Sequence, residues 1–127
     1  MEKIITSVIG FGLSGRYFFS PFIEQNPLYT LHSVLTSQKE TVNKEYPEAI
    51  VFDSIDEVLS NKDIRLVVIA SPNFTHFDYT KKALLAGKHV IVEKPFTVSV
   101  NEAEQLIKLA GERNRILAPF QNRRWDG

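Results

Sequence analysis

Three glycines near the N-terminus stand at a spacing that can bind an anion. Gly10, Gly12 and Gly15 directly follow the apolar run 4–9, in the pattern G-x-G-x-x-G. In a dinucleotide site Gly10 would allow a tight turn, Gly12 would let the backbone approach a pyrophosphate, and Gly15 would let a helix pack closely on a strand. The helix start adds free N–H groups and the positive end of its dipole. The same spacing also occurs in ordinary turns, so the pattern needs support from the rest of the chain.

Lys94 is the second residue whose type and place indicate chemistry. It directly follows the strand-like run 89–92 and stands between Glu93 and Pro95, a proline that restricts the backbone before it. In a cleft, a lysine can donate a proton or a hydrogen bond to a reacting hydroxyl or carbonyl oxygen. The alternative interpretation is a surface lysine at the end of a strand.

Strand-like and helix-like segments alternate along the whole chain. The expected strands are apolar or alternating runs at 4–9, 29–35, 49–52, 66–70, 89–92 and 116–120. Five helices are expected between them, at 13–25, at 37–46, from 54, at 75–86 and from 99. Run 66–70 is apolar throughout, as in a strand buried on both faces of a parallel sheet. This alternation predicts a doubly wound parallel sheet, a Rossmann-like α/β fold.

The helix boundaries and buried faces can also be predicted. Pro21 is expected to kink or stop the first helix because it lacks an N–H, and Gly87 is expected in a left-handed C-cap. Thr75 can cap the fourth helix. Capping boxes are expected at Ser37–Glu40, Ser54–Glu57 and Ser99–Glu102. The inward-facing residues are expected to be Leu13, Tyr17 and Phe18 in the first helix, Ile55, Val58 and Leu59 in the third, and Ala103, Leu106, Ile107 and Ala110 in the fifth.

Composition excludes several classes of function. Lysine plus arginine equals aspartate plus glutamate at 15 each, so no nucleic-acid or anionic-membrane surface is indicated. The chain has no cysteine, and we expect no metal site. No apolar stretch approaches the roughly 18 residues that span a membrane, and a cytoplasmic location is the default expectation.

In a doubly wound sheet, ligands bind outside the carboxyl ends of the strands. Three segments should reach that edge: the glycine turn, residues 71–76 and residues 93–95. These segments together resemble the glucose–fructose oxidoreductase/inositol dehydrogenase (Gfo/Idh/MocA) family, most specifically in the string A-G-K-H-V-I-V-E-K-P at 86–95. The ending Q-N-R-R-W-D at 121–126, and Pro21 in the first helix, are similar to its NADP-dependent scyllo-inositol dehydrogenase branch.

The resemblance implies roles for individual residues. Lys94 would be the catalytic lysine, bonding to the hydroxyl that is oxidised, and Glu93 would sit beside the nicotinamide. His76 would line the nicotinamide half of the site, although a helix-start histidine satisfied by backbone is an equal alternative; His32 and His89 are expected to be structural. Arg124 has no expected role. The expected cofactor-binding residues are Gly10, Gly12, Leu13, Ser14, Gly15, Thr36, Ser37, Lys39, Ser71, Pro72, Asn73, His76, Glu93, Lys94, Asn122, Arg123 and Trp125.

The charge at the end of the second strand indicates which cofactor is bound. An NAD site usually places Asp or Glu about 20 residues after the glycines, on the ribose 2′-OH. Here Thr36, Ser37 and Lys39 occupy this region, and no acid occurs before Glu40. A 2′-phosphate would meet hydroxyls and an ammonium group, so NADP is predicted over NAD.

The resemblance also implies that part of the active site is missing. We interpret residues 1–120 as the dinucleotide-binding domain and 121–127 as the start of a connection to a substrate domain absent from this chain. That domain would supply an Asp and a His, bind a polyol or sugar, and form a homo-oligomer; this chain alone should turn over little substrate. Two alternatives stay open: an NAD-dependent glycosidase of the same broad family, and a non-catalytic nucleotide-binding sensor.

Overall fold

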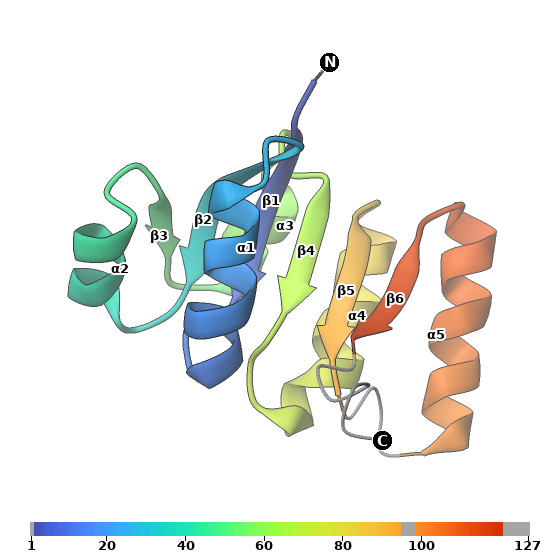
Figure 1. Cartoon of the computed structure of the whole chain (residues 1–127). Helices are drawn as coiled ribbons and strands as arrows, with labels where there is room; N and C mark the ends of the chain where they lie inside the picture. The colour runs from blue at the N-terminus through green and yellow to red at the C-terminus, as the bar shows by residue number, and fades with distance from the viewer. Residues whose placement is uncertain (1, 95–98, 121–127) are drawn as a thin grey trace, which may run out of the picture.

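The computed structural model describes residues 2–94 and 99–120, and these form a six-stranded sheet flanked by helices (Figure 1). The strand order is β3-β2-β1-β4-β5-β6 and all the pairs are parallel, so the chain begins mid-sheet and winds outward on both sides. The doubly wound, Rossmann-like fold predicted from the sequence is thereby confirmed. The strands are β1 Ile4–Ile9, β2 Tyr29–Leu35, β3 Ile50–Phe52, β4 Leu66–Ile69, β5 His89–Glu93 and β6 Leu117–Phe120.

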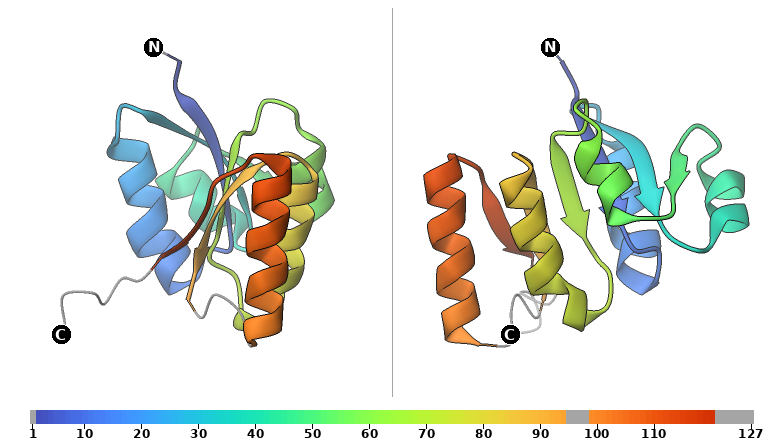
Figure 2. Two further views of the ribbon diagram at one scale, coloured as in Figure 1. Left: turned by 90° about the vertical axis from the view of Figure 1, so that its right-hand side faces the viewer. Right: turned by 180° about the vertical axis from the view of Figure 1, so that it is seen from behind.

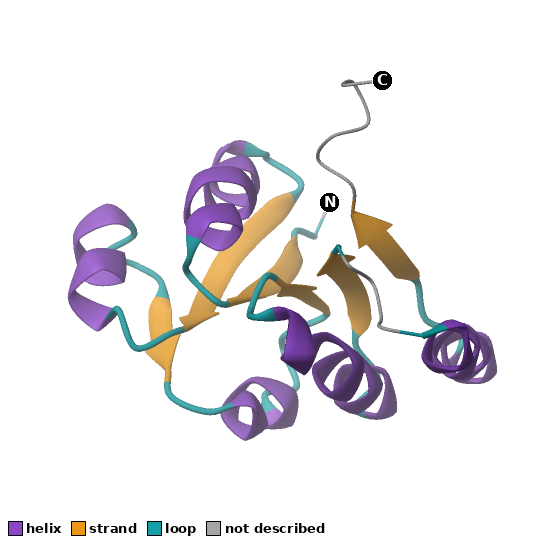
Figure 3. Cartoon of the chain, turned by 90° about the horizontal axis from the view of Figure 1, so that it is seen from below, coloured by secondary structure: helices purple, strands orange, loops and turns teal. Residues whose placement is uncertain are grey.

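Helices cover both faces of the sheet (Figures 2 and 3). On one face lie a π-helix, η1 Gly15–Phe19, its continuation α1 Ser20–Gln25, and α2 Lys39–Glu45. On the other lie α3 Ile55–Ser60, a single 3-10 turn η2 Asn73–Thr75, α4 His76–Leu85 and α5 Val100–Arg113. Within the part of the chain that the structure describes, no helix is long and apolar enough to cross a membrane.

Two apolar cores form because successive strand residues point to opposite faces. Val8, Val34 and Val68 pack with Phe19 and Ile23 under η1 and α1. On the other face, the strand residues Ile9, Val67 and Ile69 belong to a second core. The helices α3, α4 and α5 contribute Val58, Leu84 and Leu106 to it. All four residues of β4 are buried, as its continuous apolar sequence predicts.

The first helix differs from its prediction. Leu13, Tyr17 and Phe18 are 74%, 59% and 49% exposed, and the large apolar side chains that the helix buries are Phe19 and Ile23. For Tyr17 and Phe18 the reason is a π-turn: the N–H of Ser20 bonds to the carbonyl of Gly15, five residues back. This wider turn rotates the following residues around the helix axis. Pro21 does not stop the helix, since it falls in the first turn of α1, where its missing N–H is tolerated.

The predicted helix boundaries were partly wrong. Ser37 forms no capping box; Gln38 is the N-cap of α2 and makes no side-chain cap. Thr75 precedes α4 without capping it, because its hydroxyl bonds to Ser71 and to the carbonyl of Pro72. Ile107 on α5 is 61% exposed instead of buried. The Ser54–Glu57 box is confirmed, Ser99 Oγ accepts from the N–H of Glu102, and Gly87 has the left-handed φ of 82°.

Because Ser54 caps α3 and Ser37 does not cap α2, the pair gives a matched stability test. Ser54→Ala is expected to lower the free energy of unfolding by about 1 kcal/mol, since it leaves an N–H at the start of α3 unsatisfied. Ser37→Ala should change it by less than about 0.5 kcal/mol, because Ser37 is exposed and makes no side-chain hydrogen bond within the described residues. Urea denaturation of both variants checks the difference, and equal losses would contradict the assignment of the caps.

Candidate cofactor site at the carboxyl edge of the sheet

The glycine turn joins β1 to η1 and packs tightly at two of its glycines. Gly10 has a φ of 98°, and a β-carbon there would lie 2.8 Å from the carbonyl oxygen of Ala70, at the end of β4. A β-carbon on Gly15 would overlap the carbonyl oxygen of Gly10. Both positions therefore exclude a side chain, one by backbone conformation and both by close packing.

Gly12 differs from the other two glycines. A β-carbon on Gly12 would meet no atom within 4 Å, and the residue is exposed. Its carbonyl accepts the N–H of Arg16 at 2.9 Å, whereas its own N–H makes no hydrogen bond to any other described residue. The turn thus leaves open space and an unused donor where a pyrophosphate backbone contact is expected.

A second part of the edge, residues 71–76 after β4, is held by its own hydrogen bonds. Ser71 Oγ lies 2.6 Å from Thr75 Oγ1, and His76 Nε2 lies 2.8 Å from the carbonyl oxygen of Ser71. The His76 ring is buried, with 1% exposure. His76 therefore has the backbone contact expected of a structural histidine at a helix start. Its contact with nicotinamide stays a prediction. Pro72 and Asn73 are exposed at the same edge.

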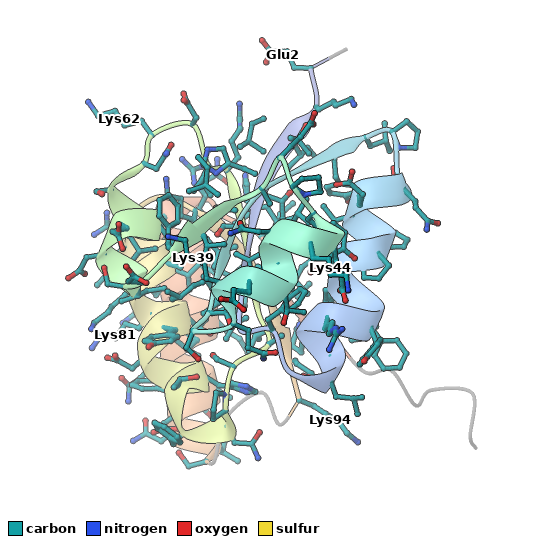
Figure 4. All side chains as sticks on the ribbon, turned by 90° about the vertical axis from the view of Figure 1, so that its left-hand side faces the viewer. Glu2, Lys39, Lys44, Lys62, Lys81 and Lys94 are labelled. Atoms are coloured by element: carbon teal, nitrogen blue, oxygen red, sulfur yellow. The ribbon has the colours of Figure 1, made fainter. Side chains whose placement is uncertain are left out.

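Ser14 and Glu93 bring the glycine turn to the end of β5. Ser14 Oγ donates to Glu93 Oε1, although the two residues are 79 positions apart. In the sheet β4 lies between β1 and β5, so this hydrogen bond joins the segments that follow two strands on either side of β4. Lys94 directly follows Glu93 in the sequence. Lys94 is exposed and makes no side-chain hydrogen bond within the described residues. Figure 4 shows Lys94 at the opposite end of the molecule from Glu2 and Lys62.

The residues that follow β2 carry no acid directly after the strand. Thr36 Oγ1 accepts the N–H of Gln38 at 3.1 Å, while Ser37 and Lys39 are exposed and make no side-chain hydrogen bond within residues 2–94 and 99–120. Arg16, which follows the glycine turn, forms an ion pair with Glu45 at the end of α2, with nitrogen–oxygen distances of 3.2 and 2.5 Å. This hydrogen bonding lowers the pKa of the Glu45 carboxyl.

The other histidines lie outside this edge. His89, at the start of β5, accepts the N–H of Ile116 through Nδ1 at 3.0 Å; burial, with help from Arg115 and Arg65, lowers its pKa. Burial likewise lowers the pKa of His32, in the middle of β2. Among the described residues, no group of three His, Asp or Glu side chains is arranged to hold a metal.

Two roles were not anticipated from the sequence. Lys88 is buried, and its Nζ donates to the carbonyl oxygens of Asn61 at 2.6 Å and Ile64 at 2.8 Å, so it joins the loop before β4 to the start of β5. Gln38 bonds to the carbonyl of Phe11 inside the glycine turn. The predicted site residues Asn122, Arg123 and Trp125, like Pro95, lie outside the described residues.

The open glycine turn, the strand order and the polar carboxyl edge define a dinucleotide-binding Rossmann domain. Residues 4–121 match the Gfo/Idh/MocA family, described as an oxidoreductase family with an NAD-binding Rossmann fold. The chain belongs to this family, and it is an NAD-binding oxidoreductase domain.

Relatives show how much of such a protein the chain represents. It is 34% identical to the scyllo-inositol 2-dehydrogenase (NADP(+)) IolW of Bacillus subtilis (strain 168), over 99% of this chain and 35% of the relative. A crystal structure of an oxidoreductase from Bacillus cereus has a TM-score of 0.90 at 33% identity, covering 97% of this chain and 36% of that one. KijD10, a 3-ketoreductase from Actinomadura kijaniata in complex with NADP and TDP-benzene, has a TM-score of 0.87 at 26% identity, covering 93% and 37%. The chain thus spans about a third of their length.

Proposed function

We propose that the chain is the NADP-binding part of an oxidoreductase that transfers a hydride between nicotinamide and a secondary alcohol of a polyol or sugar. The observation that carries this proposal is the open space at Gly12 together with the Ser14–Glu93 contact, which supports a role for Lys94, the residue after Glu93, beside a pyrophosphate cradle. The activities of two relatives, the scyllo-inositol 2-dehydrogenase IolW and the 3-ketoreductase KijD10, support the reaction class.

The residues present fit a dinucleotide. Gly12 has the space for a pyrophosphate oxygen and an N–H that makes no hydrogen bond to a described residue, and a side chain there would fill the cradle. The bound nicotinamide supplies the hydride acceptor or donor. Lys94, which is exposed and unpaired in the described chain, would donate a hydrogen bond to the alcohol oxygen as negative charge develops on it.

The remaining groups belong to a longer protein in this proposal. Residues 121–127 would begin the connection to a substrate domain that supplies the orienting Asp, the His that removes the hydroxyl proton, and the homo-oligomer contact. Relatives about three times as long as this chain support such a domain. A cytoplasmic location stays part of the proposal.

The preference for NADP rests on Thr36, Ser37 and Lys39, which follow β2 without an intervening acid. Lys39→Glu is expected to weaken NADPH binding by about tenfold and NADH binding by less than about twofold, because a carboxylate would repel the 2′-phosphate. The measurement is fluorescence titration of each variant with both reduced cofactors.

Lys44→Glu is the matched control, since Lys44 is an exposed lysine of the same helix near its other end (Figure 4). It should leave the ratio of the two affinities unchanged. A wild-type chain that binds NADH more tightly than NADPH would contradict the assignment of the cofactor, whatever the variants do.

A further inference from the structure

Gln38 links two parts of the site that are far apart in the sequence. It is the N-cap residue of α2, and its side-chain Nε2 donates to the carbonyl oxygen of Phe11 at 2.9 Å. Phe11 stands between Gly10 and Gly12 in the glycine turn, 27 positions away from Gln38. The loop after β2 is therefore bonded directly to the backbone of the turn.

Both ends of this link are held in place. The N–H of Gln38 bonds to Thr36 Oγ1 at 3.1 Å, and its carbonyl accepts the N–H of Val42 at 3.2 Å. At the other end the Phe11 ring is 2% exposed and packs edge-on against Tyr46, with 6.2 Å between the ring centroids. The bond from Gln38 therefore joins two anchored points and can fix the peptide between them.

The consequence concerns the peptide group shared by Phe11 and Gly12. In a planar trans peptide, the C=O of one residue and the N–H of the next point in opposite directions. Fixing the Phe11 carbonyl against Gln38 therefore fixes the direction of the Gly12 N–H. That N–H makes no hydrogen bond to a described residue and belongs to the glycine that leaves open space.

We infer that Gln38 is a positioning residue for the pyrophosphate: it holds the Phe11–Gly12 peptide so that the Gly12 N–H faces the anion before the anion arrives. This inference rests on the proposed function, because it needs a dinucleotide in the cradle. A donor already oriented costs less to order when the ligand binds. Gln38 acts only through Phe11 and need not touch the cofactor.

The test compares two ligands on the 127-residue chain by NMR titration. ADP-ribose carries the pyrophosphate without a 2′-phosphate, and adenosine 2′-monophosphate carries the 2′-phosphate without a pyrophosphate. Gln38→Leu keeps most of the side-chain volume and removes the donor. We expect about tenfold weaker binding of ADP-ribose, the effect of losing one oriented hydrogen bond, and less than about twofold change for adenosine 2′-monophosphate. The Gly12 amide resonance should also lose most of its ligand-induced shift.

Gln25→Leu is the control, since Gln25 is an exposed glutamine at the end of α1. It should bind both ligands as the wild type does. Unchanged ADP-ribose affinity in Gln38→Leu would overturn the inference and leave the proposed function standing. Equal weakening of both ligands with a lowered unfolding temperature would overturn it as well, because the role would then be structural. A wild-type chain that binds neither ADP-ribose nor NADPH would refute the proposed function itself.

Discussion

Gly12→Ala is expected to weaken NADPH binding by about a hundredfold or more while leaving the stability of the chain unchanged or slightly raised. The new methyl group meets no atom of the chain within 4 Å, but it occupies the space through which a pyrophosphate approaches the backbone. Gly12 does not have a positive φ, so alanine adds no backbone strain and reduces the freedom of the unfolded chain. Fluorescence titration and urea denaturation of the same sample measure the two effects.

Gly15→Ala is the matched comparison. Its methyl group would overlap the carbonyl oxygen of Gly10, so the start of η1 must move away from the end of β1. We expect a loss of about 1–3 kcal/mol in the free energy of unfolding, as for other overpacked buried positions. If Gly12→Ala destabilised the chain as much as Gly15→Ala, or bound NADPH as the wild type does, the division of roles within the turn would be wrong.

Lys94→Ala is expected to lower kcat by about 10²–10⁴-fold in the longer protein that carries the substrate domain, with cofactor affinity nearly unchanged. The range is that of removing a group that assists proton transfer or charge stabilisation. Stability should change by less than about 0.5 kcal/mol, because Lys94 is exposed and makes no side-chain hydrogen bond within the described residues. Steady-state kinetics with a polyol substrate, alongside cofactor titration, separates the two quantities.

The control for Lys94 is Lys62→Ala, an exposed lysine at the opposite end of the molecule (Figure 4). It should leave kcat and cofactor affinity unchanged. Full activity of Lys94→Ala would contradict the role of Lys94 in the reaction. Loss of cofactor binding alone would instead assign Lys94 to the cradle.

The fold could be predicted because its signals are local. Apolar runs, turn residues and glycines recur in an order that few topologies satisfy, and the strand register follows from the buried faces. Errors arose where local rules compete. The π-turn at Gly15–Phe19 shifts the buried face of the first helix, and no 3.6-residue period can show that. Ser37 is not the N-cap residue of α2; Gln38 is, and it bonds to Thr36 and Phe11, a tertiary arrangement that the capping-box pattern does not show.

Some features of the candidate site could likewise be predicted from the sequence, and others could not. The glycine turn could be predicted from spacing, because Gly10 and Gly15 lie where the backbone packs too closely for a side chain, whereas Gly12 leaves open space. The bonds Ser14–Glu93 and Gln38–Phe11 could not, since they join residues 79 and 27 positions apart and depend on side-chain conformation. Lys88 was also missed: a lysine beside a strand gives no local sign that its ammonium is buried on two carbonyls.

The most direct test of the central claim is equilibrium titration of the 127-residue chain with NADPH and NADH, followed by nicotinamide fluorescence. We expect saturable binding of one equivalent of NADPH, tighter than NADH, and loss of that binding in Gly12→Ala at unchanged stability. Absence of binding for both cofactors, or tighter binding of NADH, would contradict it.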